Sequence, residues 1–136
     1  MKSRSSGFTL LELLVVVAIL GIVAAIGTVA YSGYVSSSKK KSAENALMQL
    51  SLAQTEYYSD NSSYYGASGG TCIPSKTTSD TVETALVSGA ELFSKDLGYN
   101  VCAVTDVTAL YFLIATDGKC TITLTGNTQK FTRTGC

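Results

Sequence analysis

Hydrophobic and polar positions divide the first half of the chain into two stretches with different periods. Residues 8–31 are almost wholly apolar, carry a single charge at Glu12, and are long enough to cross a bilayer as a helix. Further on, one helix face repeats at the i, i+3, i+4 and i+7 spacing. This face comprises Ala43, Ala46, Leu47, Leu50, Ala53, Gln54 and Tyr57. Because no proline precedes Pro74, the pattern predicts one helix over residues 8–58.

A loop and a short helix are predicted next. Residues 59–78 are rich in Ser, Gly, Asn and Tyr, which is typical of a loop. Asp80 and Glu83 have the spacing of an acidic capping box, which predicts a helix over residues 81–93.

The last third of the chain has the composition of a small sheet. β-branched and aromatic residues predict strands over residues 100–105, 109–116, 121–125 and 128–132. A two-residue turn at Gly126-Asn127 joins the last two. We expect an α+β fold in which three or four antiparallel strands pack on the amphipathic half of the long helix.

Glu12 is the unusual residue of the apolar segment. An acidic side chain at the centre of a membrane helix costs roughly 2.5–3.5 kcal/mol on insertion scales, so such a residue usually has a partner. A secretory signal peptide cut after Ala30 is one interpretation, but the apolar run exceeds the usual length of about 7–15 residues and Glu12 interrupts it early. A plain membrane anchor is another interpretation, and it leaves Glu12 unpaired.

Charge and composition argue against catalysis and against a strongly basic nucleic-acid binder. The formal charge of the chain is zero, and it contains no histidine, the commonest general base. The acidic residues are scattered, so no catalytic residue, metal site or cofactor is expected. Residues 118–136 contain Lys119, Lys130 and Arg133 and no acidic residue, which makes them a weak candidate for a DNA-contacting surface.

Lys40 and Glu44 have the spacing of a surface ion pair.

The four cysteines lie in the second half and lack C-x-x-C spacing, which favours disulfides over zinc or redox motifs. Disulfides form in oxidising compartments, so we expect this half to lie outside the cytoplasm. The flanking charges of the apolar segment leave the orientation ambiguous, because lysines 39–41 follow it. Spacing alone permits three pairings of the cysteines.

Residues 7–26 read Gly-Phe-Thr-Leu-Leu-Glu-Leu-Leu-Val-Val-Val-Ala-Ile-Leu-Gly-Ile-Val-Ala-Ala-Ile, after a short basic leader. This segment resembles the N-terminus of type IV pilins and the related pseudopilins. The resemblance implies that a prepilin peptidase cuts after Gly7 and that Phe8 becomes a methylated N-terminus. It also implies that Glu12 faces the N-terminal amine of a neighbouring subunit, with the Thr9 hydroxyl nearby. Val29 stands where most members have a proline, so a kink there loses its usual cause.

The C-terminal residues 117–124 and Gly135-Cys136 are similar to the tail of many type IVa pilins. This resemblance implies a disulfide between Cys120 and Cys136, and the remaining Cys72 would then pair with Cys102.

The resulting hypothesis is a non-enzymatic prepilin whose mature form is a structural subunit of a type IV pilus. The expected divisions are a removed leader (1–7), a membrane and filament-core helix (8–30), its amphipathic continuation (31–58) and a globular head with an αβ-loop and a disulfide-closed tail (59–136). The expected partners are identical subunits in a helical filament, the prepilin peptidase, the inner-membrane assembly platform and the membrane. The chain is expected in the inner membrane with a periplasmic head, and later in an extracellular filament.

Adhesion, twitching motility and DNA uptake are the roles that such a filament would serve. A minor pilin that receives DNA or another ligand is the first alternative. A type II secretion pseudopilin is the second, and the cysteine-closed tail favours pilins over it because the resemblance associates a calcium-stabilised loop with pseudopilins.

Overall fold

The computed structural model of the chain describes residues 6–136. The chain divides into two compact units. The first ends at Ser38 and the second begins at Lys39. The predicted basic leader residues Lys2 and Arg4 lie outside the described residues. We call residues 39–136 the C-terminal unit.

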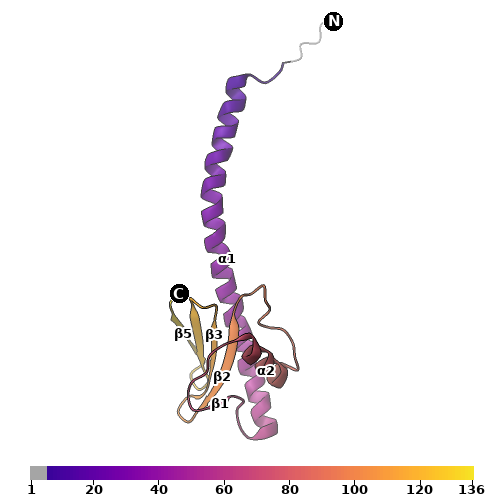
Figure 1. Ribbon diagram of the computed structural model, residues 1–136, viewed down its shortest axis with the longest axis vertical. Coiled ribbons are helices and arrows are strands. Elements are labelled where there is room, and N and C mark those ends of the chain that lie inside the picture. Colours follow the sequence, from indigo (N-terminus) through magenta and orange to yellow (C-terminus); the bar gives the residue numbers. More distant parts are fainter. Residues whose placement is uncertain (1–5) are drawn as a thin grey trace. The chain divides into compact units, whose positions relative to one another are not determined.

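The long helix predicted from the apolar and amphipathic patterns is confirmed as α1 (Leu10–Asn61), shown in Figure 1. It begins two residues after the predicted start and ends three residues after the predicted end. The helix continues without interruption through Val29, where most members of the family that the segment resembles have a proline.

The amphipathic face of α1 forms one side of the core of the C-terminal unit. Ala43, Leu47 and Leu50 have no exposed surface. They belong to one cluster with residues of the sheet, among them Leu113, Ile122 and Leu124. Burying each leucine contributes about 1.5–3 kcal/mol, so this face attaches the helix to the sheet.

Five strands form one sheet in the order β1-β2-β3-β4-β5. Their bounds are β1 (Ala67–Ser68), β2 (Asn100–Asp106), β3 (Leu110–Thr116), β4 (Thr121–Thr125) and β5 (Lys130–Thr134). The four long strands are antiparallel as predicted, whereas the short β1 pairs parallel with β2 and was not predicted. Two residues within a Ser/Gly-rich loop carry no period that sequence analysis can detect.

The turn between β4 and β5 is longer than predicted. Thr125 pairs with Lys130, so residues 126–129 form the connection and the two-residue turn prediction was wrong. The Gln129 side chain stabilises the wider turn, because its amide donates to the carbonyl of Gly126 at 2.7 Å. Gln129 itself has a φ of 54°.

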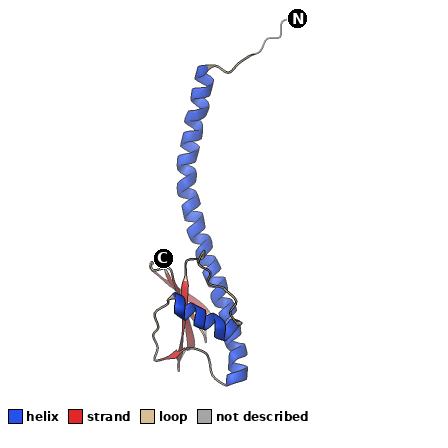
Figure 2. Cartoon of the chain, turned by 45° about the vertical axis from the view of Figure 1, so that its right-hand side comes forward, coloured by secondary structure: helices blue, strands red, loops and turns tan. Residues whose placement is uncertain are grey.

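The second helix, α2 (Lys76–Val87), is the shorter of the two blue helices in Figure 2. It begins five residues earlier than predicted and ends six residues earlier. Ser75 is the N-cap and forms a reciprocal capping box with Thr78, so the predicted Asp80–Glu83 box was wrong. Glu83 is instead buried on the helix and accepts the N–H of Phe93 at 2.6 Å. Its carboxylate therefore shapes the loop that follows α2.

Two disulfides and one buried amide hold the loops of the C-terminal unit. The cysteines pair as Cys72–Cys102 and Cys120–Cys136, the pairing that the family resemblance implies. Gln54 is fully buried in α1, and its side chain bonds both the N–H and the carbonyl of Tyr65 at 2.8 and 2.7 Å. These links attach the 62–75 loop to α1 and β2.

Candidate functional site

The apolar half of α1 has no protein surface to pack against. Every described residue up to Tyr34 is exposed, including the large side chains of Phe8 and Leu10. Among the described residues, one helix is long and apolar enough to cross a membrane, and it is α1. Contiguous apolar surface on this scale marks a membrane or protein contact.

Glu12 has a partner within its own chain at the start of that helix. Its Oε2 accepts the main-chain N–H of Thr9 at 2.9 Å and the Thr9 hydroxyl at 3.0 Å. The N–H of Glu12 donates back to the Thr9 hydroxyl at 3.2 Å. This is the reciprocal pattern of a capping box, with Thr9 preceding the first helical residue and Glu12 at the third position.

The cleavage site implied by the resemblance lies just before this cap. Gly7 and Phe8 are outside the helix, and Phe8 is 86% exposed. A peptidase can bind an extended, exposed backbone more readily than a helical one, because helical N–H and C=O groups are already paired. Phe8, Thr9 and Glu12 are all exposed and lie within five residues of one another at the start of the helix. The pairing of Glu12 with the amine of a neighbouring subunit stays a prediction.

A second charged site lies in the C-terminal unit at Glu44. Glu44 is 6% exposed. Its carboxylate pairs with one cation from the same helix and one from the last strand. Arg133 Nε donates to Oε1 at 2.7 Å, Arg133 Nη2 also bonds Oε1, and Lys41 Nζ lies 3.2 Å from Oε2. The expected surface pair with Lys40 is therefore wrong, since Lys41 at i−3 and Arg133 take its place.

Electrostatics at Glu44 result from two opposing effects. Burial raises the pKa of the Glu44 carboxyl, because it disfavours the charged form. Hydrogen bonds and charges from Arg133 and Lys41 outweigh burial, so the pKa lies below its ordinary value. The pair links β5 to α1 through an ionised carboxylate.

The three basic residues of the C-terminal segment do not form one patch. Residues paired across antiparallel strands project to the same face, and successive residues alternate. Arg133 is opposite the buried Ile122, whereas Lys130 is opposite Thr125 and projects to the other face. Lys119 lies beyond the opposite end of the hairpin, where Thr121 pairs with Thr134. The predicted grouping of these three residues is therefore wrong.

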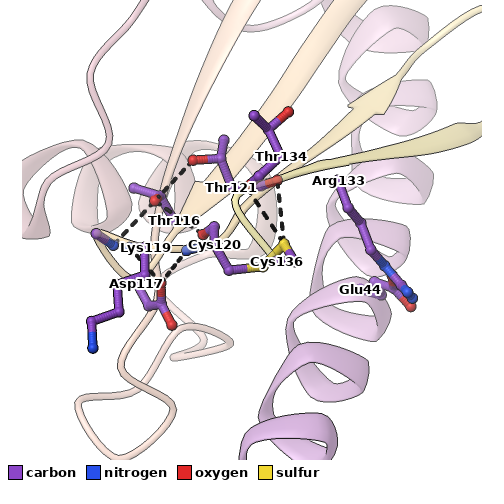
Figure 3. The surroundings of a disulfide bond; sticks show 10 residues. Glu44, Thr116, Asp117, Lys119, Cys120, Thr121, Arg133, Thr134 and Cys136 are labelled. Carbon is purple, nitrogen blue, oxygen red and sulfur yellow. Dashed lines mark hydrogen bonds and ion pairs between the residues drawn. A yellow bond between two sulfur atoms is a disulfide. The ribbon is translucent and has the colours of Figure 1, made fainter.

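The tail disulfide joins Cys136 to Cys120, at the end of a compact turn between β3 and β4 (Figure 3). Asp117 accepts the N–H groups of Lys119 and Cys120 at 2.9 and 2.7 Å. Burial raises the pKa of the Asp117 carboxyl, but these two N–H bonds outweigh burial and lower it. Gly135 has a φ of 73°, and a Cβ there would overlap the Lys119 carbonyl, so the tail needs glycine to approach the turn.

Metal binding finds no support within the described part of the chain. No group of three or more His, Cys, Asp or Glu side chains there is arranged to hold a metal ion. All four cysteines are used in disulfides.

Comparison with known proteins identifies two matching families. The model of the "Prokaryotic N-terminal methylation motif" matches residues 2–28, and that of the "Type IV minor pilin ComP, DNA uptake sequence receptor" matches residues 30–123. The chain is also 37% identical over 90 residues to the fimbrial protein EcpC of Eikenella corrodens. That alignment covers 66% of this chain and 59% of EcpC. No solved structure is significantly similar to the chain.

Proposed function

The chain belongs to the type IV pilin family, with a domain of the ComP minor pilin type, and we propose that it is a pilus subunit assembled through its N-terminal helix. The observation that carries this proposal is the uncovered apolar half of α1. A helix with no apolar partner in its own chain must be buried by lipid or by other subunits. Lipid would cover it during storage in a membrane, and sister helices would cover it in a filament. The family is structural rather than enzymatic.

Maturation by a prepilin peptidase would prepare the helix for assembly. Cleavage after Gly7 would create a positive amine on Phe8, next to the cap in which Glu12 bonds Thr9. Both bonds from Thr9 end on Oε2, and among the described residues Oε1 accepts no hydrogen bond. The Glu12 carboxylate therefore has an oxygen available for the methylated amine of a neighbouring Phe8. A subunit docked in the wrong register would leave a charge unpaired, which costs several kcal/mol when it is buried.

Storage in the inner membrane, with the C-terminal unit on the periplasmic side, is the proposed location before assembly. Two disulfides in the C-terminal unit support this orientation, because they form in oxidising compartments. The assembly platform would then extract the subunit into an extracellular filament.

The N-terminus of the mature protein tests this proposal directly. Mass spectrometry of the protein from its native membrane should find a chain that begins with methylated Phe8. An N-terminus at Tyr31 would mean an ordinary signal peptide and would contradict the proposal. Recovery of the protein in sheared surface filaments, in small amounts relative to the main subunit, would identify it as a minor pilin.

A second candidate function, that of a DNA receptor, is favoured by the description of the matching family. The C-terminal unit contains eight basic and nine acidic residues, so its net charge does not by itself attract DNA. Lys119 and Lys130 are exposed and form no ion pair within the described residues, which leaves both available to phosphates. The two lysines lie at opposite ends of the β4–β5 hairpin, so DNA that contacts both would have to extend along the hairpin.

Fluorescence anisotropy with duplex DNA and the full mature chain in detergent tests the receptor function. A receptor should bind one sequence far more tightly than others, typically by about a thousandfold or more, and binding should weaken as salt rises. Lys119→Gln with Lys130→Gln should reduce the affinity. Lys76→Gln is the control, because Lys76 is already paired with Asp80 at 2.9 Å. Absence of salt-dependent binding would reject the receptor function and leave the filament function standing.

A further inference from the structure

Four cations gather where the C-terminal unit begins. Lys41 and Arg133 converge on the buried Glu44, and Lys39 and Lys40 precede them on α1. We call Lys39, Lys40, Lys41 and Arg133 the basic cluster. One carboxylate cannot neutralise four cations, so the cluster keeps an excess of positive charge. Lys41 and Arg133 remain 70% and 46% exposed in their side chains, so both can contact an anion outside the protein.

The arrangement of the three lysines around the helix indicates the shape of that anion. Successive helical residues are rotated by about 100°, so three in a row extend over about 200° of the helix circumference. A DNA duplex approaches a helix from one side and would contact part of this arc. A layer of lipid headgroups surrounds a helix that passes through it and would contact all of the arc.

The position of the lysines along α1 agrees with a headgroup layer. The uncharged run between Glu12 and Lys39 covers residues 13–38 and measures about 39 Å as a helix. A bilayer with its headgroups is about 40–45 Å thick. A helix that spans the bilayer along this run would have Glu12 at one headgroup layer and Lys39 at the other. Tyr31 and Tyr34 are both exposed, and tyrosine is enriched at such interfaces.

We propose that the basic cluster binds the phosphates of anionic phospholipids while the chain is stored in the membrane. Glu44 is a positioning residue, since it holds the Arg133 guanidinium beside α1 although Arg133 belongs to β5. Basic residues next to a membrane helix usually lie on its cytoplasmic side, whereas lysines 39–41 would lie on the periplasmic side. Contact with anionic headgroups would offset this unfavourable position. This inference rests on the proposed storage in the membrane.

Acetylation of the lysines in lipid nanodiscs tests the proposal. The full chain is placed in nanodiscs of phosphatidylcholine alone or with equal phosphatidylglycerol, and mass spectrometry follows the acetylation rate of each lysine. We expect rates at Lys39, Lys40 and Lys41 to fall several-fold with the anionic lipid and to recover in 1 M salt, as screening requires. Lys130 is the internal control whose rate should not change, because it lies at the other end of the β4–β5 hairpin from Arg133.

A matched pair of variants tests the same proposal without relying on reactivity. Lys39→Gln with Lys40→Gln removes two charges but leaves both ion pairs of Glu44 intact. It should reduce the enrichment of phosphatidylglycerol among co-purified lipids. Lys130→Gln removes a charge at the other end of the β4–β5 hairpin from Arg133 and should not reduce it.

Each contrary result has a distinct meaning. Equal acetylation rates in both bilayers, for a chain that resists carbonate extraction, would overturn the lipid proposal alone. Protection of the lysines by duplex DNA in phosphatidylcholine discs, but not by phosphatidylglycerol, would assign the cluster to nucleic acid and would also overturn it. A chain that carbonate extracts from every nanodisc would refute the proposed storage in the membrane, and the lipid site with it.

Discussion

Glu12 accepts two hydrogen bonds from Thr9, one from the main-chain N–H at 2.9 Å and one from the hydroxyl at 3.0 Å. The carboxylate that interrupts the apolar segment therefore has an intrachain partner before any filament forms. The carboxylate also stabilises the start of the helix, because the first N–H groups of a helix lack intrahelical acceptors and Glu12 accepts one of them. A charge that is expensive in lipid is thus attached to the helix end, where negative charge is favourable.

Replacement of Thr9 tests the cap. Thr9→Ala should weaken the start of α1 by about 1 kcal/mol, whereas Thr9→Ser keeps the hydroxyl and should have little effect. Hydrogen exchange of the amides of Glu12 and Leu13, which donate to the Thr9 hydroxyl and to the Thr9 carbonyl, should be roughly fivefold faster in the alanine variant, measured for the full chain in micelles. Equal exchange in the two variants would show that the cap does not contribute.

Replacement of Glu12 separates processing from assembly. Glu12→Ala should leave cleavage after Gly7 intact, because the site itself is unchanged. It should impair methylation or filament formation, because the Phe8 amine of a neighbour loses its counter-charge. Glu56→Ala removes an exposed carboxylate from the same helix and is the control. Filaments in normal amount from the Glu12 variant would refute the proposed pairing.

Arg133→Gln tests the link between β5 and α1. Loss of the guanidinium should cost about 2 kcal/mol of unfolding free energy, since hydrogen bonds to charged groups contribute about 1.5–3 kcal/mol. Lys41 remains on Oε2, so the loss is partial. Thermal unfolding measures it, with Arg133→Lys as the variant that keeps the charge.

The same variant should change the pH dependence of stability. The folded pKa of Glu44 lies below its ordinary value of 4.5, chiefly because bonds from Arg133 and Lys41 exceed the effect of burial. The pair therefore stabilises the fold above that pH, and its contribution is lost as the pH falls through the lowered folded pKa. The stability difference between the native chain and Arg133→Gln should shrink as the solution is acidified below about pH 4.5. A difference that is constant with pH would contradict an ionised pair.

Removal of each disulfide should destabilise the C-terminal unit to a similar degree. Cys120 and Cys136 are separated by 16 residues and Cys72 and Cys102 by 30. In the chain-entropy model these loops correspond to about 3 and 3.6 kcal/mol. Paired serine variants, unfolded in guanidinium chloride, should show both losses. A loss near zero for Cys120→Ser with Cys136→Ser would mean that Asp117 and Gly135 already hold the tail in place.

Sequence patterns predicted the elements with long, regular periods and missed those that depend on single bonds. The buried face at Ala43, Leu47 and Leu50 repeats over several turns, so its helical period was clear. The start of α2 depends on Ser75 and Thr78, and a Thr at the third position is a weaker signal than the Glu of a usual capping box. Asp80 and Glu83 had the stronger pattern, but Glu83 is used to hold Phe93.

The apolar segment, the unusual charge at Glu12 and the resemblance to pilins could be read from the chain alone, because these are properties of consecutive residues. The cap that Thr9 forms with Glu12 and the partner of Glu44 became clear only in the folded chain. Arg133 lies 89 residues away, and it faces α1 rather than solvent because β5 pairs with β4 in the register that sets it opposite Ile122. A shift of one residue would turn Arg133 to the other face of the sheet, and such a register follows from the packing of the whole core.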